Sequence, residues 1–237
     1  MDGQMKTPRA VGLLVGLAIV SAVGFGLGCS PFIGTTAASF LRKARESDDP
    51  NIRYLAYSKL GSMGCYDRQE QKDEAVELLV ENMKPGREPT ATRAIICRTL
   101  GELRRPEAHE VLVKATEDPD PIVRCEAFRA LGKVGTIEDA ALLARLMTVD
   151  RNLDCRLAAI DGIGELHASD SRILGMLVDQ MDHDDPSIRL ASLRALRKLT
   201  KKDLGVVPEP WREFLAQGNK AQGPASDPGT RRASTER

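Results

Sequence analysis

One pattern recurs five times along the chain and limits the folds that the chain can adopt. Each copy contains an Arg; the first two of these Arg residues are 40 positions apart, and the later ones are 31 to 33 positions apart. The residue seven positions after each Arg is aliphatic in all five copies, and the next residue is Gly in four. A nearly fixed period of this length indicates stacked copies of one structural unit. The five Arg residues are Arg53, Arg93, Arg124, Arg156 and Arg189.

The spacing inside each copy identifies the unit as a pair of helices. Positions three, four and seven after the Arg share one face of an α-helix, and they are mostly small or apolar in these copies. Stretches such as "DDPNIR" and "DPDPIVR" begin with an acid and Pro, which is a helix-start signal because the acid can cap free backbone N–H groups. A second apolar-periodic segment precedes each copy, so each unit is a helical hairpin of about thirty residues.

The hairpins must stack, because a single pair of helices cannot bury its own apolar face. The composition suits such a core: among 237 residues there are only one Trp, three Tyr and five Phe, so small aliphatic side chains must fill it. We therefore expect an all-α, right-handed α-solenoid of about five hairpins, occupying residues 35–200.

The two-helix period, the acid-Pro entry to the second helix and the small-plus-Leu pattern behind it resemble HEAT repeats. The nearest variety is the short bacterial kind that also occurs in phycobilisome lyase subunits. This resemblance implies that the repeated Arg and the Asp before it form a ladder along the stack. It therefore gives the five Arg residues a structural role rather than a ligand-binding one. The architecture hosts many tasks, so it implies no single activity.

The N-terminus has the pattern of an export signal or a membrane anchor. Lys6 and Arg9 precede an uncharged apolar run, and together they form a predicted signal or anchor over residues 1–28. Cys29 follows directly, in a context that resembles the lipobox of bacterial lipoproteins, which implies lipidation of this Cys and a short linker over residues 29–34. Gly26 departs from that pattern, and a retained transmembrane helix or a cleaved, soluble product are the alternatives. We expect a membrane-anchored protein on the extracytoplasmic, periplasmic side of a bacterial membrane.

The C-terminal part of the sequence changes character after the repeats. A solenoid end exposes apolar surface and needs a cap, and Trp211 lies in a short amphipathic segment that can supply it. We expect this capping helix within residues 201–216, although the segment can also be read as a docking motif for a partner. Residues 217–237 are rich in Gly, Pro, Ser and charge, which is typical of a disordered tail.

The cysteines permit one disulfide but indicate no metal or redox motif. The sequence has no Cys-x-x-Cys, and free buried Cys residues acting as small apolar side chains are the simpler interpretation. An oxidising compartment would allow a bridge, and we expect Cys65 and Cys97 to be the best-placed pair. Cys125 and Cys155 are the remaining thiols after Cys29.

No catalytic constellation is visible, so we expect a non-enzyme without a cofactor. Phosphate-binding and nucleophile motifs are absent from the sequence, and the single His109-Glu110 pair is too little for a metal site. Acidic and basic residues balance at 34 each, which gives no reason to expect a nucleic-acid partner. No small-molecule substrate is evident either.

Binding of another protein is the expected function. Position five after the Arg points away from the core and carries Arg98, Arg129 and Arg194, interrupted by Asp161. This basic stripe can hold the carboxylates of a protein partner, or it can be an ordinary solvated face. We expect a membrane-tethered interaction scaffold; the alternatives are a lyase-like or chaperone-like protein acting on a chromophore-bearing partner, and a purely structural envelope component.

Overall fold

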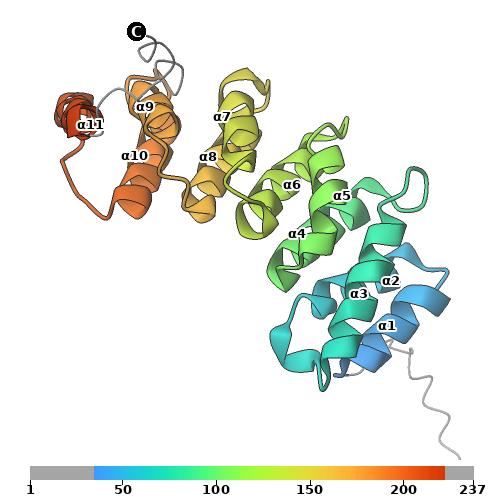
Figure 1. The fold of residues 1–237 in the computed structure, drawn as a ribbon. Helices are drawn as coiled ribbons and strands as arrows, with labels where there is room; N and C mark the ends of the chain where they lie inside the picture. The colour runs from blue at the N-terminus through green and yellow to red at the C-terminus, as the bar shows by residue number, and fades with distance from the viewer. Residues whose placement is uncertain (1–34, 222–237) are drawn as a thin grey trace, which may run out of the picture. The chain divides into compact units, whose positions relative to one another are not determined.

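The computed structural model describes residues 35–221, and these residues are helical with no strand (Figure 1). Cys29, the predicted leader and linker, and most of the predicted tail lie outside the described residues. Within them the expected all-α solenoid is confirmed. The helices are α1 (Ala37–Glu46), α2 (Pro50–Leu60), η1 (Met63–Cys65), α3 (Gln69–Asn82), α4 (Thr90–Leu103), η2 (Pro106–Ala108), α5 (His109–Ala115), α6 (Pro121–Val134), α7 (Asp139–Val149), α8 (Leu153–Leu166), α9 (Ser171–Gln180), α10 (Pro186–Thr200) and α11 (Pro208–Ala221).

The acid-Pro signals start helices as the sequence predicts. Asp49, Asp120 and Asp185 are the N-caps of α2, α6 and α10, and each carboxylate accepts a hydrogen bond from the backbone N–H two residues later, at 2.7 to 2.9 Å. The following Pro is the first helical residue in each case, where its missing N–H costs no hydrogen bond. The fourth unit uses Asn152 instead, which accepts from the backbone N–H of Cys155 at 3.1 Å.

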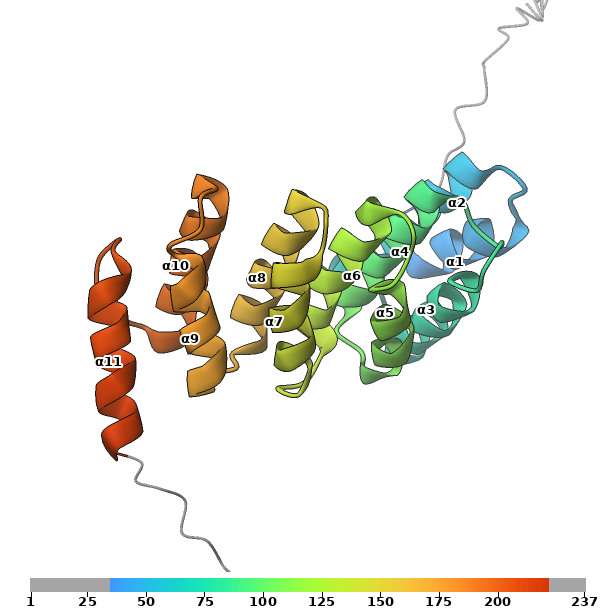
Figure 2. The same ribbon diagram turned by 90° about the horizontal axis from the view of Figure 1, so that it is seen from above.

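Ten of these helices form five hairpins that follow one another in two layers (Figure 2). The even-numbered helices α2, α4, α6, α8 and α10 each contact the next one in the series, so the second helices form one continuous layer. The predicted core offsets are confirmed, because every residue at positions three, four and seven after the repeated Arg is buried. These residues are Ala56, Tyr57, Leu60, Ile96, Cys97, Leu100, Ala127, Phe128, Leu131, Ala159, Ile160, Ile163, Ser192, Leu193 and Leu196.

The recurring Gly allows the second helices to approach each other closely. A Cβ at Gly132 would lie 2.6 Å from the Cα of Gly162, and a Cβ at Gly101 would lie 2.8 Å from the Cα of Ala130. Real Cβ atoms do not approach backbone this closely, so a larger residue would push the units apart. Gly is therefore a packing requirement at positions 101 and 132, whereas a Cβ at Gly61 or Gly164 would make only ordinary contacts with the next unit.

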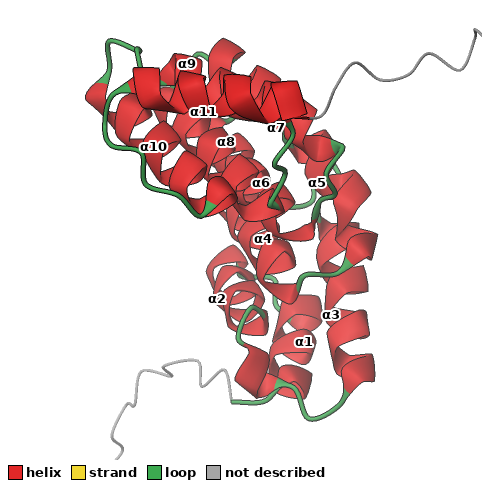
Figure 3. Cartoon of the chain, turned by 60° about the vertical axis from the view of Figure 1, so that its left-hand side comes forward, coloured by secondary structure: helices red, strands yellow, loops and turns green. Residues whose placement is uncertain are grey.

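The helix after the fifth unit covers the end of the stack (Figure 3). Helix α11 packs against α9, and Trp211 is fully buried in the same core cluster as the fourth and fifth units. The indole Nε1–H donates to the carbonyl oxygen of Gly205 at 3.1 Å, so burial leaves no unpaired donor on this ring. The helix continues to Ala221, beyond the boundary predicted at Ala216.

Three of the repeated Arg residues form the ladder that the resemblance implies. Arg53 donates to both oxygens of Glu88 at 2.7 and 2.9 Å, and Arg93 makes the same two-pronged contact with Asp118 at 3.0 and 3.1 Å. Arg124 binds Asp150 at 2.9 and 3.0 Å. In each pair the acid belongs to the following unit and is less exposed than the Arg, so these contacts join neighbouring hairpins.

The last two positions of the ladder depart from it. Arg156 meets His183 instead of an acid, with Nη1 3.3 Å from the ring Nε2, and its buried Nε has no hydrogen-bond partner among residues 35–221. Arg189 donates to the backbone carbonyls of His183 and Asp184, both at 2.8 Å, as Arg53 and Arg124 do to the matching carbonyls, but no acid of a sixth unit among the described residues completes its contacts. The expectation of a uniform ladder is therefore wrong at these two positions.

Candidate functional site

The three Arg residues predicted to contact a partner lie on the even-numbered helices, but they are not free. Arg98 and Arg129 share the carboxylate of Glu126, at 2.7 and 3.2 Å, and Arg194 lies 3.7 Å from Asp161. All three side chains keep between 42% and 63% of their surface exposed. The expected basic stripe is therefore corrected to a partly neutralised one, since its charges are paired with acids of the same layer.

A second charged row, which the sequence interpretation missed, runs beside the first. Nine positions after the repeated Arg stand Glu102, Lys133, Glu165 and Lys198, alternating in sign from one unit to the next. Lys133 binds Glu102 and Lys198 binds Glu165, both at 2.5 Å. The contact with Lys198 lowers the pKa of Glu165. The alternation at this offset was the sequence signal that could have revealed the row.

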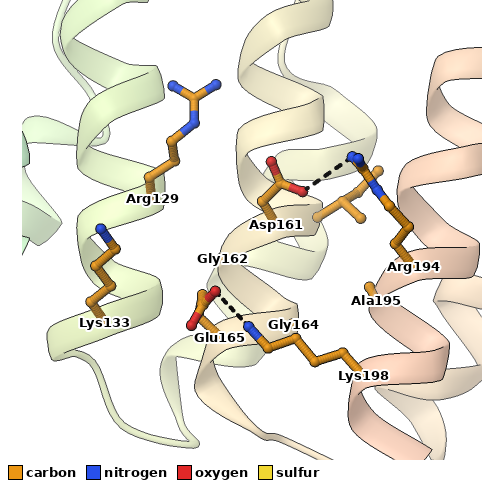
Figure 4. A pocket seen from close by; sticks show the side chains of 10 residues that line it. Arg129, Lys133, Asp161, Gly162, Gly164, Glu165, Arg194, Ala195 and Lys198 are labelled. Atoms are coloured by element: carbon orange, nitrogen blue, oxygen red, sulfur yellow. Dashed lines mark ion pairs between the residues drawn. The ribbon is translucent and has the colours of Figure 1, made fainter.

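A groove lies between α6, α8 and α10, with a cavity volume of about 270 Å³ (Figure 4). Small residues form its floor, because Gly162, Gly164 and Ala195 carry little or no side chain. Arg129 and Lys133 project from α6 on one side, as Figure 4 shows.

Charge in this groove is unevenly placed. Asp161 and Glu165 on α8 both pair with cations of α10, namely Arg194 and Lys198. The two cations of α6 pair elsewhere: Arg129 with Glu126 of the same helix, and Lys133 with Glu102 of α4. Neither pairs with an acid that lines this hollow (Figure 4). Four cations and two carboxylates line the groove, which gives it a positive balance.

A second hollow of about 350 Å³ adjoins the first along the same layer. It is lined by Arg98, Glu102, Glu126, Arg129, Ala130 and Lys133, so Arg129 and Lys133 stand between the two hollows and line both. We name the two hollows together the second-helix groove. An extended segment placed along it would meet cations on α4, α6 and α10, and the carboxylates of Asp161 and Glu165 on α8.

The second-helix groove is lined by charged and small apolar side chains. The charged groups are guanidinium, ammonium and carboxylate groups, and the lining contains no Ser, Cys or His. Within residues 35–221, no group of three or more His, Cys, Asp or Glu side chains is arranged to hold a metal ion. His109 binds Asp139 of the next unit at 2.9 Å, while Glu110 binds Lys114, so the His109-Glu110 pair does not act together.

Residues 85–164 match the family described as HEAT repeats. This part of the chain, which includes α4 to α7 and most of α8, is similar to HEAT repeats. A chain of the complex of CpcE and CpcF of phycocyanin lyase from Nostoc sp. PCC7120 has a similar fold, with a TM-score of 0.58 and 20% sequence identity. The match covers 83% of this chain and 74% of that one. No curated protein matches the sequence significantly.

Cys65 and Cys97 are buried thiols in different elements. Cys65 lies in η1, after the end of α2, with Sγ 3.7 Å from the carbonyl oxygen of Lys59, while Cys97 is fully buried inside α4. All four cysteines of the described residues are free thiols in the structure, so the expected Cys65–Cys97 bridge is not formed there.

Among residues 35–221, none of the helices combines the length and the apolar character that a membrane crossing requires. The predicted leader over residues 1–28 lies outside these residues.

Proposed function

We propose that this HEAT-repeat protein is a non-catalytic scaffold that binds a partner protein along the second-helix groove. The observation that carries the proposal is the placement of Arg129 and Lys133, which line both hollows of the groove above a floor of small residues. A partner segment bearing Asp or Glu side chains is the expected occupant. Its carboxylates would receive charge-assisted hydrogen bonds from cations already held in place.

The existing ion pairs favour such exchange. The Arg194–Asp161 contact is long, at 3.7 Å, and both side chains are about half exposed or more. Pairs of this kind contribute only about 0 to 1 kcal/mol, so a partner carboxylate can replace Asp161 at small cost. Glu126 is different, because its side chain is only 10% exposed and it holds both Arg98 and Arg129. It keeps those two guanidinium groups oriented without covering them.

The place of this scaffold in the cell is also part of the proposal. The apolar leader followed by Cys29 supports a lipid or helical tether to a membrane, with the HEAT repeats on the extracytoplasmic side. Replacing Cys29 by Ser should abolish incorporation of labelled fatty acid in bacterial cells. Equal labelling of the variant and the natural sequence would refute lipidation at this residue.

Site-specific photo-crosslinking in the cells that produce the protein tests the binding surface. A photoreactive amino acid is placed at position 129 or 194, and the crosslinked products are identified by mass spectrometry. We expect one and the same partner protein from both groove positions. Position 172 serves as the matched control, because Arg172 is a highly exposed cation on α9 in the other layer.

Charge reversal makes the test quantitative. The double variant Arg129→Glu with Arg194→Glu should lose most of the captured partner when it is crosslinked from position 133, while Arg172→Glu should lose none. Far-ultraviolet circular dichroism checks that both variants keep their helices. Equal capture from position 172 and from the groove, or unchanged capture by the double variant, would refute the proposed surface.

A second candidate function follows from the structural neighbour. That protein is a phycocyanin lyase subunit complex, and its fold similarity favours action on a chromophore-bearing partner as the alternative. Incubating the purified protein with the chromophore released from phycocyanin distinguishes the two functions. A new visible absorbance band that stays with the protein through gel filtration supports the lyase-like function, whereas its absence supports the scaffold.

A further inference from the structure

Two thiols of neighbouring HEAT units lie side by side inside the stack. Cys125 is in the first turns of α6, and Cys155 is in the first turn of α8. The Sγ of Cys155 lies 3.1 Å from the carbonyl oxygen of Pro121. In an α-helix that carbonyl also accepts the backbone N–H of the residue four positions later, which is Cys125. The Cys155 sulfur therefore sits against the helical turn that carries Cys125.

The two side chains are also neighbours in the core. Both belong to one buried cluster, and each thiol affects the pKa of the other, lowering that of Cys125 and raising that of Cys155. Helices α6 and α8 pack directly, and further along them a Cβ at Gly132 would lie 2.6 Å from the Gly162 Cα. A disulfide requires Cα atoms within about 7 Å, which only closely packed backbones provide. These helices are packed in that way.

We propose that Cys125 and Cys155 are a modification site, at which a low-molecular-weight disulfide oxidises them to an intramolecular disulfide joining the third and fourth units. The thiolate of Cys125 attacks one sulfur of the oxidant and releases one small thiol, which leaves a mixed disulfide on Cys125. The Cys155 sulfur then attacks the Cys125 sulfur and releases the second small thiol. The two protein thiols lose two electrons and two protons, and the oxidant gains both.

The surroundings of the two thiols determine which of them attacks the oxidant first and which reacts second. Cys125 is 6% exposed and Cys155 is completely buried, so the oxidant reaches Cys125 first. Burial raises the pKa of both thiols, but the contact with Cys155 and the charge of Arg129 act in the opposite direction on Cys125. The pKa of Cys155 is raised further by the same contact, which suits the residue that reacts second. Both buried thiols react slowly, because the thiolate is the reactive form.

The bond would fix the spacing of two helices that line the second-helix groove. Arg129 follows Cys125 by one helical turn on α6, and Asp161 lies farther along α8. The oxidised protein would therefore hold one end of the groove at a constant width. The proposal does not depend on what the groove binds.

Peptide mapping after oxidation tests the pairing directly, because each of the four cysteines among the described residues falls on a different tryptic peptide. The full-length protein is incubated with oxidised glutathione, its remaining thiols are alkylated in denaturant, and it is digested with trypsin. We expect the peptides "CEAFR" and "NLDCR" to appear joined, and to separate after reduction. Cys65 and Cys97 should be alkylated, on "LGSMGCYDR" and "AIICR".

Two variants complete the test. The double variant Cys65→Ser with Cys97→Ser should still form the joined peptide, and its Tm should rise on oxidation and return on reduction. Cys155→Ser should retain glutathione on Cys125 as a stable mixed disulfide, since the second step is blocked. Alkylation of all four thiols after oxidation, or a joined peptide containing Cys65 or Cys97 instead, would overturn the proposal.

Discussion

Replacing His183 by Asp should stabilise the protein, because it completes the interrupted Arg ladder. His183 occupies the place that Asp118 and Asp150 occupy in earlier units. Each of those acids accepts the backbone N–H two residues later at 2.9 Å, and His183 does the same with its ring Nδ1, also at 2.9 Å. The Nδ1 atom therefore carries no proton, so the neutral ring carries it on Nε2.

This tautomer places a donor against a donor. The Nε2–H of His183 faces the Nη1 of Arg156 at 3.3 Å, where both groups have only hydrogens to offer. The adjacent Nε of Arg156 is buried and has no partner within the described residues. Asp at position 183 would instead offer two oxygens, as Asp150 does to Arg124.

The expected gain is about 1 kcal/mol in the free energy of unfolding. Hydrogen bonds to charged groups contribute about 1.5 to 3 kcal/mol when a buried donor gains its partner. Part of this is offset by desolvation of the new carboxylate and by repulsion from the neighbouring Asp182 and Asp184. A gain of about 1 kcal/mol corresponds to a rise in Tm of about 2 to 4 °C for a domain of this size.

Urea denaturation followed by circular dichroism measures the effect, at neutral pH and in moderate salt that screens the Asp repulsion. His183→Asn is the matched control: its amide oxygen can accept the same backbone N–H, but its amide nitrogen still presents donors to Arg156, so we expect no gain. In an Arg156→Met background the Asp substitution should lose its benefit. Equal stability of the Asp and Asn variants, or a benefit that survives without Arg156, would refute the reasoning.

Other substitutions test the packing and the ladder. Gly132→Ala should destabilise the protein by about 1 to 3 kcal/mol, because its Cβ would meet facing backbone at 2.6 Å. Gly175→Ala in α9 is the control: its Cβ meets no described atom within 4 Å, so the protein should gain about 0.5 to 1 kcal/mol. Urea denaturation midpoints measure both changes in the free energy of unfolding. Burial raises the pKa of Asp150, but hydrogen bonds from Arg124 and from a backbone N–H outweigh this and lower it overall. The stability contributed by this pair is therefore present at neutral pH and lost as the pH falls below about 4, so Asp150→Asn should be less stable at pH 7 and approach the natural protein near pH 3. A constant difference between the two proteins across that pH range would contradict the linkage.

Local sequence rules were sufficient for the helices and their buried faces. The acid-Pro starts and the aliphatic residue seven positions after each Arg depend on spacing within one unit, and the structure places both as predicted. The partners of the surface charges depend on the neighbouring unit. Glu126 illustrates this, since its position near the core face gave no indication that it holds both Arg98 and Arg129.

The cysteines also show that sequence spacing alone does not predict contacts between neighbouring units. The sequence interpretation favoured Cys65 with Cys97, yet it is the Sγ of Cys155 that lies against the turn of α6 carrying Cys125, because the position of each side chain depends on how α6 and α8 pack.

The sequence by itself determined the number of units, the helical nature of each and the face that each must bury, because the residues of one helical face recur every three to four positions within a single helix. Only the tertiary structure decided which charges neutralise each other, which hollow remains open between α6, α8 and α10, and which helix the sulfur of Cys155 contacts. Those contacts join residues about thirty positions apart, and their distances are fixed by the rotation and separation of adjacent hairpins.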